Sequence, residues 1–261
     1  MKPDAVAQAA EILLDNRNRG TRIGQLPPEC RPAGRADGYA IQDAMLRHSG
    51  DEAAGWKIAA TSAAGQAHIA VDGPLAGRLW RTRIVTDGAT VSLRGNAMRV
   101  VEAEFAFRMA RALPPRGTPY AVDEVLAAAS ALHLGIEVPD SRFEPFTQAG
   151  MAQLIADNAC TGWYVLGAEV AAPWRERDLV RHAVTAYRNG EVGARGDGSA
   201  VLGDPRVALA WIANELATYG EGLQAGEIVT TGTCIKPMEV GEGDAVRMDF
   251  GDFGDVRVRL G

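Results

Sequence analysis

Two glutamates stand two residues apart in a segment that reads as a β-strand. Strand side chains alternate between faces, so Glu102 and Glu104 share one face, while residues 101, 103, 105, 107 and 109 form an apolar face. Like charges beside apolar surroundings repel each other and lose hydration, and a divalent cation relieves both costs. Mg²⁺ and Mn²⁺ prefer such oxygen ligands. The alternative for this pair alone is a solvated strand face.

A third acid, Glu137, is the one charge in the apolar run Leu134–Val138. A carboxylate in such a run needs a partner. Two partners remain open from the sequence: the same cation, or the guanidinium of Arg142.

Lys57 is likewise a single charge in a strand-like apolar segment. A buried lysine transfers protons or pairs with anions, whereas an edge lysine extends its ammonium group to water. The chain has only three lysines among its 27 basic residues, so a lysine at this position hints at a chemical requirement.

Helical spacing of apolar residues predicts a helix over 4–17 with Asp4 as its cap, and a second helix over 37–48. The segment 21–36 between them is rich in proline and is expected to be a loop. We expect residues 1–54 to form an N-terminal helical cap.

Residues 55–261 are expected to form one catalytic core. Strands are predicted over 98–109 and 132–138, and hairpins at Asp87-Gly88, at Asn189-Gly190 and over 245–260. Helices are expected over 122–130 and 204–219, the latter with a capping aspartate and a proline at its first position. Regular βαβ alternation is lacking, which favours an α+β fold.

Composition narrows the function classes. The chain has 261 residues, of which 47% are hydrophobic and 23% charged, as in ordinary globular proteins. The net charge of −6 and scattered arginines disfavour a nucleic-acid binder, and no run is long and apolar enough for a membrane span. Three widely spaced cysteines give no disulfide framework or zinc motif, so a cytoplasmic setting is expected.

Six segments in order along the chain resemble the 2-keto-4-pentenoate hydratase and 4-oxalocrotonate decarboxylase group of the fumarylacetoacetate hydrolase superfamily. They are G-W-K-I-A-A-T-S (55–62), V-E-A-E-F-A-F (101–107), I-E-V-P-D-S-R (136–142), A-D-N-A (156–159), G-D-P-x-x-A-L-A-W-x-A-N-x-L (203–216) and L-x-A-G-E-I-V-T-T-G-T (223–233). Each is modest alone, and their combination is specific.

This resemblance implies a mixed β-roll or sandwich core with a helical N-terminal part. It implies a Mg²⁺ or Mn²⁺ site at Glu102, Glu104 and Glu137, with Lys57 as the catalytic residue. The substrate-side candidates are Thr61, Ser62, Gln66, Cys160 and Thr233. Members of the group usually form homo-oligomers, and hydratases and decarboxylases of this kind associate with each other.

The implied substrate is a small 2-oxo acid, or its dienol, from the catabolism of aromatic compounds. A cation held against its carboxylate and 2-oxygen stabilises an enolate. The expected activity is therefore a hydratase that adds water to a 2-hydroxy-2,4-dienoate or its 2-oxo tautomer.

The chain departs from the hydratase pattern at Leu75, where the group usually has an aspartate, and Asp72 nearby is interpreted as a turn residue. A 4-oxalocrotonate-type decarboxylase is thus an alternative. A C–C bond hydrolase of a diketo acid is ranked lower, because the four histidines show no pairing with a glutamate in the sequence. A non-catalytic partner of a homologue remains the alternative outside enzymes.

Overall fold

The structure is a computed structural model that describes residues 1–261, and it contains six α-helices. They are α1 (Pro3–Arg19), α2 (Arg35–Ser49), α3 (Ala63–His68), α4 (Val122–Leu126), α5 (Met151–Ala156) and α6 (Pro205–Thr218). Short 3-10 turns lie between several elements, among them Arg81–Arg83 between β2 and β3 and Asn158–Cys160 between α5 and β7.

Thirteen strands form two sheets. They are β1 (Ala53–Ala59), β2 (Leu75–Trp80), β3 (Ile84–Thr86), β4 (Thr90–Val91), β5 (Val100–Met109), β6 (Ala129–Val138), β7 (Trp163–Glu169), β8 (Ala183–Arg188), β9 (Glu191–Asp197), β10 (Ile228–Thr233), β11 (Met238–Glu239), β12 (Ala245–Asp249) and β13 (Asp255–Leu260). The larger sheet has the order β2-β1-β10-β5-β6-β7-β3, and β11 pairs with β5 outside this path. The smaller sheet has the order β4-β13-β12-β8-β9.

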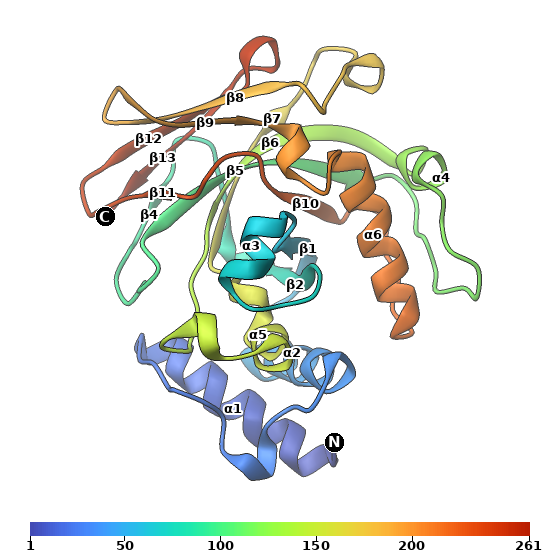
Figure 1. Ribbon diagram of the computed structural model, residues 1–261, viewed down its shortest axis with the longest axis vertical. Coiled ribbons are helices and arrows are strands. Elements are labelled where there is room, and N and C mark those ends of the chain that lie inside the picture. Colours follow the sequence, from blue (N-terminus) through green and yellow to red (C-terminus); the bar gives the residue numbers. More distant parts are fainter.

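The main core lies between the two sheets and extends to α4 and α6 at one side (Figure 1). Phe105 and Phe107 of β5 are fully buried in it, together with Val256 of β13 and Leu209 of α6. The apolar face predicted for β5 therefore faces this core, and the opposite face of the same strand carries Glu102 and Glu104.

A second core holds the N-terminal helices against the edge of the larger sheet. Leu13 of α1, Met45 of α2 and Ile155 of α5 meet there with Leu75, the first residue of β2. The helices α1, α2 and α5 lie together on one side of the sheets (Figure 1). Because α5 and β2 come from beyond residue 54, the cap shares its core with later segments, and a division at residue 54 stays a prediction.

Most predicted elements are confirmed. The two N-terminal helices, the strands β5 and β6, the hairpin of β8 and β9 and the closing hairpin of β12 and β13 are all present. Asn189 and Gly190 both have positive φ, as a tight hairpin turn requires. Asp204 caps α6 by accepting a hydrogen bond from the backbone N–H of Arg206. The mixture of two sheets with separate helices confirms the α+β class.

The hairpin predicted at Asp87-Gly88 is wrong. Gly88 makes a turn with a φ of +78°, but the flanking strands join different sheets, since β3 pairs with β7 and β4 pairs with β13. The turn therefore carries the chain from one sheet to the other. Two smaller expectations also change: Asp4 lies inside the first turn of α1 instead of at its cap, and α4 ends at Leu126 because Ala129 already begins β6.

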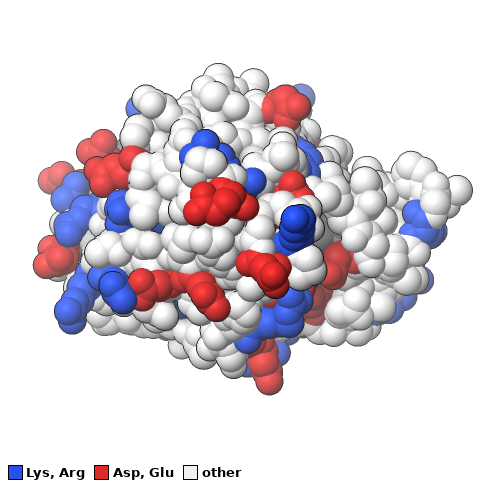
Figure 2. Space-filling model, turned by 90° about the horizontal axis from the view of Figure 1, so that it is seen from below, with Lys and Arg blue, Asp and Glu red and all other residues white.

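No helix has both the length and the apolarity to cross a membrane. On the face of the molecule seen from the side of α1, basic and acidic side chains are interspersed (Figure 2). That face shows no basic stripe of the kind that follows a nucleic-acid backbone.

Candidate metal centre

The three glutamates meet on one face of the larger sheet. Glu102 on β5 lies directly opposite Glu137 on β6, and Glu104 lies opposite Gly135. One carboxylate oxygen from each of Glu102, Glu104 and Glu137 lies within 4.8 Å of the other two. Glu104 and Glu137 are fully buried, and Glu102 is half-buried. The strand pairing thus assembles one compact carboxylate cluster from two strands that are separate in the sequence.

Lys57 reaches this cluster from β1, two strands away from β5 across β10. Its Nζ lies 3.1 Å from Oε1 of Glu137 and donates a hydrogen bond of 3.0 Å to the carbonyl oxygen of Ala159. The alternative partner for Glu137 is not used, because Arg142 forms an ion pair with Asp140. Lys57 is itself 2% exposed, so it is a buried ammonium group and not an edge lysine.

The pKa values of the cluster show how unfavourable these charges are without a further partner. Burial raises the pKa of Glu102 and Glu104 to about 7 and the pKa of Glu137 to about 8, and the neighbouring glutamates add to each shift. Burial acts to lower the pKa of Lys57, but the three carboxylates outweigh it and raise that pKa. Lys57 therefore carries a positive charge.

Several buried oxygens in the cluster lack a hydrogen bond. They are Oε1 of Glu104, both carboxylate oxygens of Glu137 and the hydroxyl groups of Tyr164 and Thr230. The contact between Lys57 and Glu137 is close enough for an ion pair, but its direction is not that of a hydrogen bond. Buried oxygens normally have hydrogen-bond partners, so this group of unbonded oxygens is suited to binding a ligand.

The cluster fits a divalent cation in both charge and chemistry. Three carboxylates against one ammonium group leave two negative charges when all are ionised, which a divalent cation balances. The donor set is oxygen only, as Mg²⁺, Mn²⁺ and Ca²⁺ prefer. No cysteine or histidine belongs to the group, which disfavours zinc.

Thr61 and Gly232 close one side of the cluster. The backbone N–H of Gly232 donates a hydrogen bond of 3.2 Å to Oε2 of Glu104. Gly232 has a φ of +100°, and a Cβ there would lie 2.1 Å from Oγ1 of Thr61. Both the backbone conformation and the close approach require glycine at this position. Thr61 therefore packs against the same residue whose N–H bonds Glu104.

The other expected substrate-side residues make contacts within the protein. Ser62 caps α3 by accepting a hydrogen bond from Gly65, and Gln66 donates one to the carbonyl oxygen of Ala60, so both stabilise the turn after β1. Thr233 lies opposite Glu104 in the pairing of β10 with β5, and its hydroxyl donates to Ile235. Contact with a substrate remains a prediction for all of these side chains.

Cys160 belongs to an unusual segment beside Lys57. Asn158, Ala159 and Cys160 all have positive φ, between 49° and 60°, a conformation costing about 1–3 kcal/mol per residue. The side chain of Asn158 bonds both the N–H and the carbonyl oxygen of Arg78, which ties the segment to β2. The result is that the Ala159 carbonyl points at Lys57. Burial raises the pKa of Cys160 to about 12, so this residue is a neutral thiol.

The position at Leu75 offers no carboxylate to the cluster. Leu75 is fully buried among the apolar side chains of the second core. Asp72 has a side chain that is 88% exposed and lies 3.9 Å from Arg35, as expected for a turn residue. Histidine also makes no contribution: His133 and His182 bond backbone carbonyl oxygens, and His48 and His68 are exposed.

Sequence reasoning missed Tyr164 and Gly135. Tyr164 on β7 pairs with Glu137, is fully buried, and has a hydroxyl group with no partner. A Cβ on Gly135 would lie 1.8 Å from that hydroxyl oxygen, so this glycine makes the room for the tyrosine. A glycine inside the apolar strand β6 was the only available signal.

Comparisons with known proteins find similarity in both sequence and structure. The family model for fumarylacetoacetate hydrolase, C-terminal, matches residues 62–260. The chain is 34% identical over 239 residues to a 2-keto-4-pentenoate hydratase from Burkholderia vietnamiensis, which covers 90% of this chain and 89% of that protein. It is 33% identical over 228 residues to a 4-oxalocrotonate decarboxylase from Pseudomonas putida, covering 86% and 85%.

Among solved structures, the 4-oxalocrotonate decarboxylase from Pseudomonas putida G7, complexed with magnesium and adipate, superposes with a TM-score of 0.90. Its sequence is 29% identical, and the match covers 100% of this chain and 98% of that one. These findings confirm both the resemblance and the fold type expected from the sequence.

Proposed function

The chain belongs to the fumarylacetoacetate hydrolase family, and on this basis we propose that it is a divalent-metal-dependent hydratase. Its substrate is a 2-hydroxy-2,4-dienoate or the 2-oxo-enoate tautomer, formed in the catabolism of aromatic compounds. Its relatives named as 2-keto-4-pentenoate hydratases are lyases of this kind, and a relative from Escherichia coli is named 2-oxo-hept-4-ene-1,7-dioate hydratase.

The observation that carries the proposal is the buried cluster of Glu102, Glu104 and Glu137 with its unbonded oxygens. We assign these three residues as metal ligands, with Mg²⁺ or Mn²⁺ as the ion. The related decarboxylase is complexed with magnesium and with a dicarboxylate, adipate, which supports binding of a divalent metal and of an acid ligand by this fold. When bound, the cation supplies electrophilic stabilisation of negative charge on the 2-oxygen of the substrate.

Lys57 is proposed as the catalytic residue. Its ammonium group has three N–H donors and donates one to Ala159, while Glu137 lies within ion-pair distance without a directed hydrogen bond, so donor capacity remains for a substrate oxygen. Because the group is protonated, it acts as a donor: it binds the substrate carboxylate or 2-oxygen and can deliver a proton there. In the overall hydration, a hydroxyl joins one carbon of the distal double bond and a proton joins the next.

Thr61, Ser62, Gln66, Cys160 and Thr233 are proposed to line the substrate side. Thr61 packs against Gly232, whose N–H bonds Glu104, Thr233 pairs with Glu104 across the strands, and Cys160 lies beside Lys57. The neutral thiol of Cys160 suits contact with the carbon chain of the substrate, since a thiol packs as a small apolar group.

Decarboxylation of a 4-oxalocrotonate-type diacid is the second candidate. The buried Leu75, where hydratases of the group carry an aspartate, favours it, because a proton-transferring carboxylate is lacking there. The similarity to 4-oxalocrotonate decarboxylases agrees with it as well.

Two product measurements distinguish these reactions. Purified protein with Mg²⁺ is mixed with a panel of 2-hydroxy-2,4-dienoates, and loss of ultraviolet absorbance is followed together with the product mass. A product that gains one water supports the hydratase, whereas loss of absorbance without added mass is ketonisation alone. Release of CO₂ from an oxalocrotonate-type diacid identifies the decarboxylase. Inactivity toward both the dienoates and the oxalocrotonate-type diacid contradicts the proposal.

Three further properties are proposed: on family grounds, a homo-oligomer and association with a homologous enzyme of the same pathway, and from the cysteine usage, a cytoplasmic location. The division into a helical cap (1–54) and a catalytic core (55–261) is proposed with them. Light scattering of the purified protein tests the first of these properties directly.

A further inference from the structure

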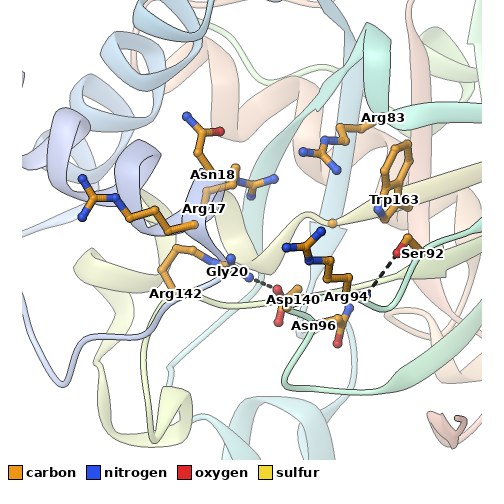
Figure 3. Close-up of a pocket in the computed structure, with 13 residues that line it drawn as sticks. Arg17, Asn18, Gly20, Arg83, Ser92, Arg94, Asn96, Asp140, Arg142 and Trp163 are labelled. Carbon is orange, nitrogen blue, oxygen red and sulfur yellow. Dashed lines mark hydrogen bonds and ion pairs between the residues drawn. The ribbon is translucent and has the colours of Figure 1, made fainter. Parts of the chain in front are cut away.

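A pocket with a basic lining lies outside the carboxylate cluster (Figure 3). It has a volume of about 400 Å³ and is formed by the end of α1, the loops after β4 and β6, the turn Arg81–Arg83 and the start of β7. None of the three glutamates or Lys57 lines it. Its one apolar residue is Trp163.

Five arginines line this pocket against a single carboxylate. They are Arg17, Arg19, Arg83, Arg94 and Arg142, and the carboxylate is Asp140. Asp140 is already occupied, because it accepts from Arg22 at 2.8 Å and also pairs with Arg142. Arg19 pairs with Asp15 at the rim. Arg17, Arg83 and Arg94 have no ion-pair partner, so the pocket holds an excess of positive charge.

Two of these guanidinium groups are held in place before any ligand arrives. Arg17 lies over the ring of Trp80, at 4.9 Å from its centroid, and Arg83 lies over Trp163 at 4.4 Å. Arg17 also donates a hydrogen bond of 2.6 Å to the carbonyl oxygen of Thr161. Such contacts fix the direction of the planar groups, which reduces the entropy lost on binding.

Two of the pocket arginines have buried N–H groups and leave part of their hydrogen-bonding capacity unused. Arg142 is 3% exposed, and its Nε, like that of Arg17, is buried without a hydrogen-bond partner. Burial lowers the pKa of Arg142 to about 10 and lowers those of Arg17 and Arg83 as well. Asp157 lies behind these arginines, but one of its oxygens already accepts from Ser141 and from the backbone of Arg142.

We propose that this pocket binds a small oxyanion that carries more than one negative charge, as a phosphate group or a polycarboxylate does. Guanidinium groups bind both through paired, charge-assisted hydrogen bonds. The pocket volume accommodates a molecule larger than inorganic phosphate. This inference does not depend on the proposed reaction, because the two sites share no residue.

Tryptophan fluorescence and titration calorimetry test the proposal on the intact protein. Inorganic phosphate and citrate are titrated separately at constant ionic strength, with chloride as the balancing ion. Trp163 and Trp80 under the pocket arginines report occupancy by fluorescence. Saturable binding of either anion is expected: tighter phosphate binding indicates a phosphorylated ligand, and tighter citrate binding indicates a polycarboxylate.

The variant Arg94→Gln removes an exposed arginine that has no ion pair, so the fold is expected to be retained. It should weaken binding about tenfold or more, since a hydrogen bond to a charged group is lost. Arg181→Gln is the matched control, because Arg181 is also exposed, has no ion pair and lies outside the pocket. Its affinity should equal that of the wild type.

Two results would overturn the proposal. One is the absence of saturable binding by both anions, including the case in which an acidic segment of a second copy already covers the pocket. The other is equal affinity in the wild type and Arg94→Gln.

Discussion

Glu102 and Glu137 lie directly opposite each other on the antiparallel strands β5 and β6. Like charges in this relationship destabilise a sheet, and burial increases the cost. Lys57 offsets only part of it, because Glu104 adds a third carboxylate to the same cluster. A bound cation would relieve this electrostatic repulsion. The same repulsion determines how variants of the site should behave.

Lys57→Met should impair both stability and catalysis. It removes the only positive charge in the cluster and leaves Glu137 buried without its ion pair, which should lower the free energy of unfolding by about 3 kcal/mol at pH 8. The loss of a positioned proton donor should lower kcat by about 10²–10⁴-fold, with a smaller change in KM. Urea denaturation and steady-state kinetics measure the two effects. Lys2→Met, at the exposed N-terminus, is the control; equal kcat in both variants would rule out the assigned role.

Tyr164→Phe should separate function from stability. The Tyr164 hydroxyl is buried without a partner, so its removal should leave stability unchanged or raise it by about 1 kcal/mol. We assign this unbonded hydroxyl as a donor to the substrate, so kcat/KM should fall about tenfold, as expected for one lost hydrogen bond. Tyr120→Phe is the matched comparison, since that hydroxyl bonds Pro114 at 2.6 Å and its loss should cost about 1 kcal/mol without affecting kcat/KM. The opposite pattern in the two variants would count against this assignment.

Gly135→Ala should disturb the cluster through Tyr164. The added methyl group would lie 1.8 Å from the tyrosine oxygen, so the ring must move. Overpacking of this kind costs about 1–3 kcal/mol, and the displaced ring should also weaken metal binding. Gly117→Ala, where no atom lies within 4 Å of the new methyl group, should change neither quantity. Thermal unfolding with and without Mg²⁺ measures both, and wild-type behaviour of Gly135→Ala would refute the packing argument.

Asp244 should make the smaller sheet sensitive to acid. Burial acts to raise its pKa, but hydrogen bonds from Gly241 and Asn189 and the ion pair with Arg188 outweigh it and lower the pKa. The stabilisation is therefore present above the pKa of the unfolded chain, near 4, and is lost as the pH falls through the lower folded value. Asp244→Asn should cost about 1 kcal/mol at pH 7 and progressively less below pH 4. A difference independent of pH in urea denaturation would contradict this.

The sequence predicted correctly that Glu102 and Glu104 share one face, because both lie on one strand, where alternation alone places them together. Glu137 and Lys57 required more, since their approach depends on the register of β6 against β5 and on the position of β1 beside β10. Spacing does not contain that information, and the resemblance to a known family supplied it.

The features that the sequence did not predict correctly also depend on contacts between distant segments. Asp87-Gly88 does form a turn, but a turn signal does not say whether the two strands pair with each other or join separate sheets. Tyr164 was missed because its place beside Glu137 comes from pairing between β6 and β7, and the arginine pocket was missed because its residues come from five distant segments. Local pattern predicts elements, whereas these contacts are set by tertiary packing.

The central claim is that Glu102, Glu104 and Glu137 hold one divalent cation. Calorimetric titration of metal-free protein with Mn²⁺ or Mg²⁺ tests it most directly, with Glu104→Gln as the site variant. Glu169→Gln, an exposed glutamate at the end of β7, is the control. We expect one ion per chain in the wild type and in Glu169→Gln, and binding about 100-fold weaker or absent in Glu104→Gln. Lack of stoichiometric binding by the wild type, or equal affinity in the two variants, would contradict the assignment.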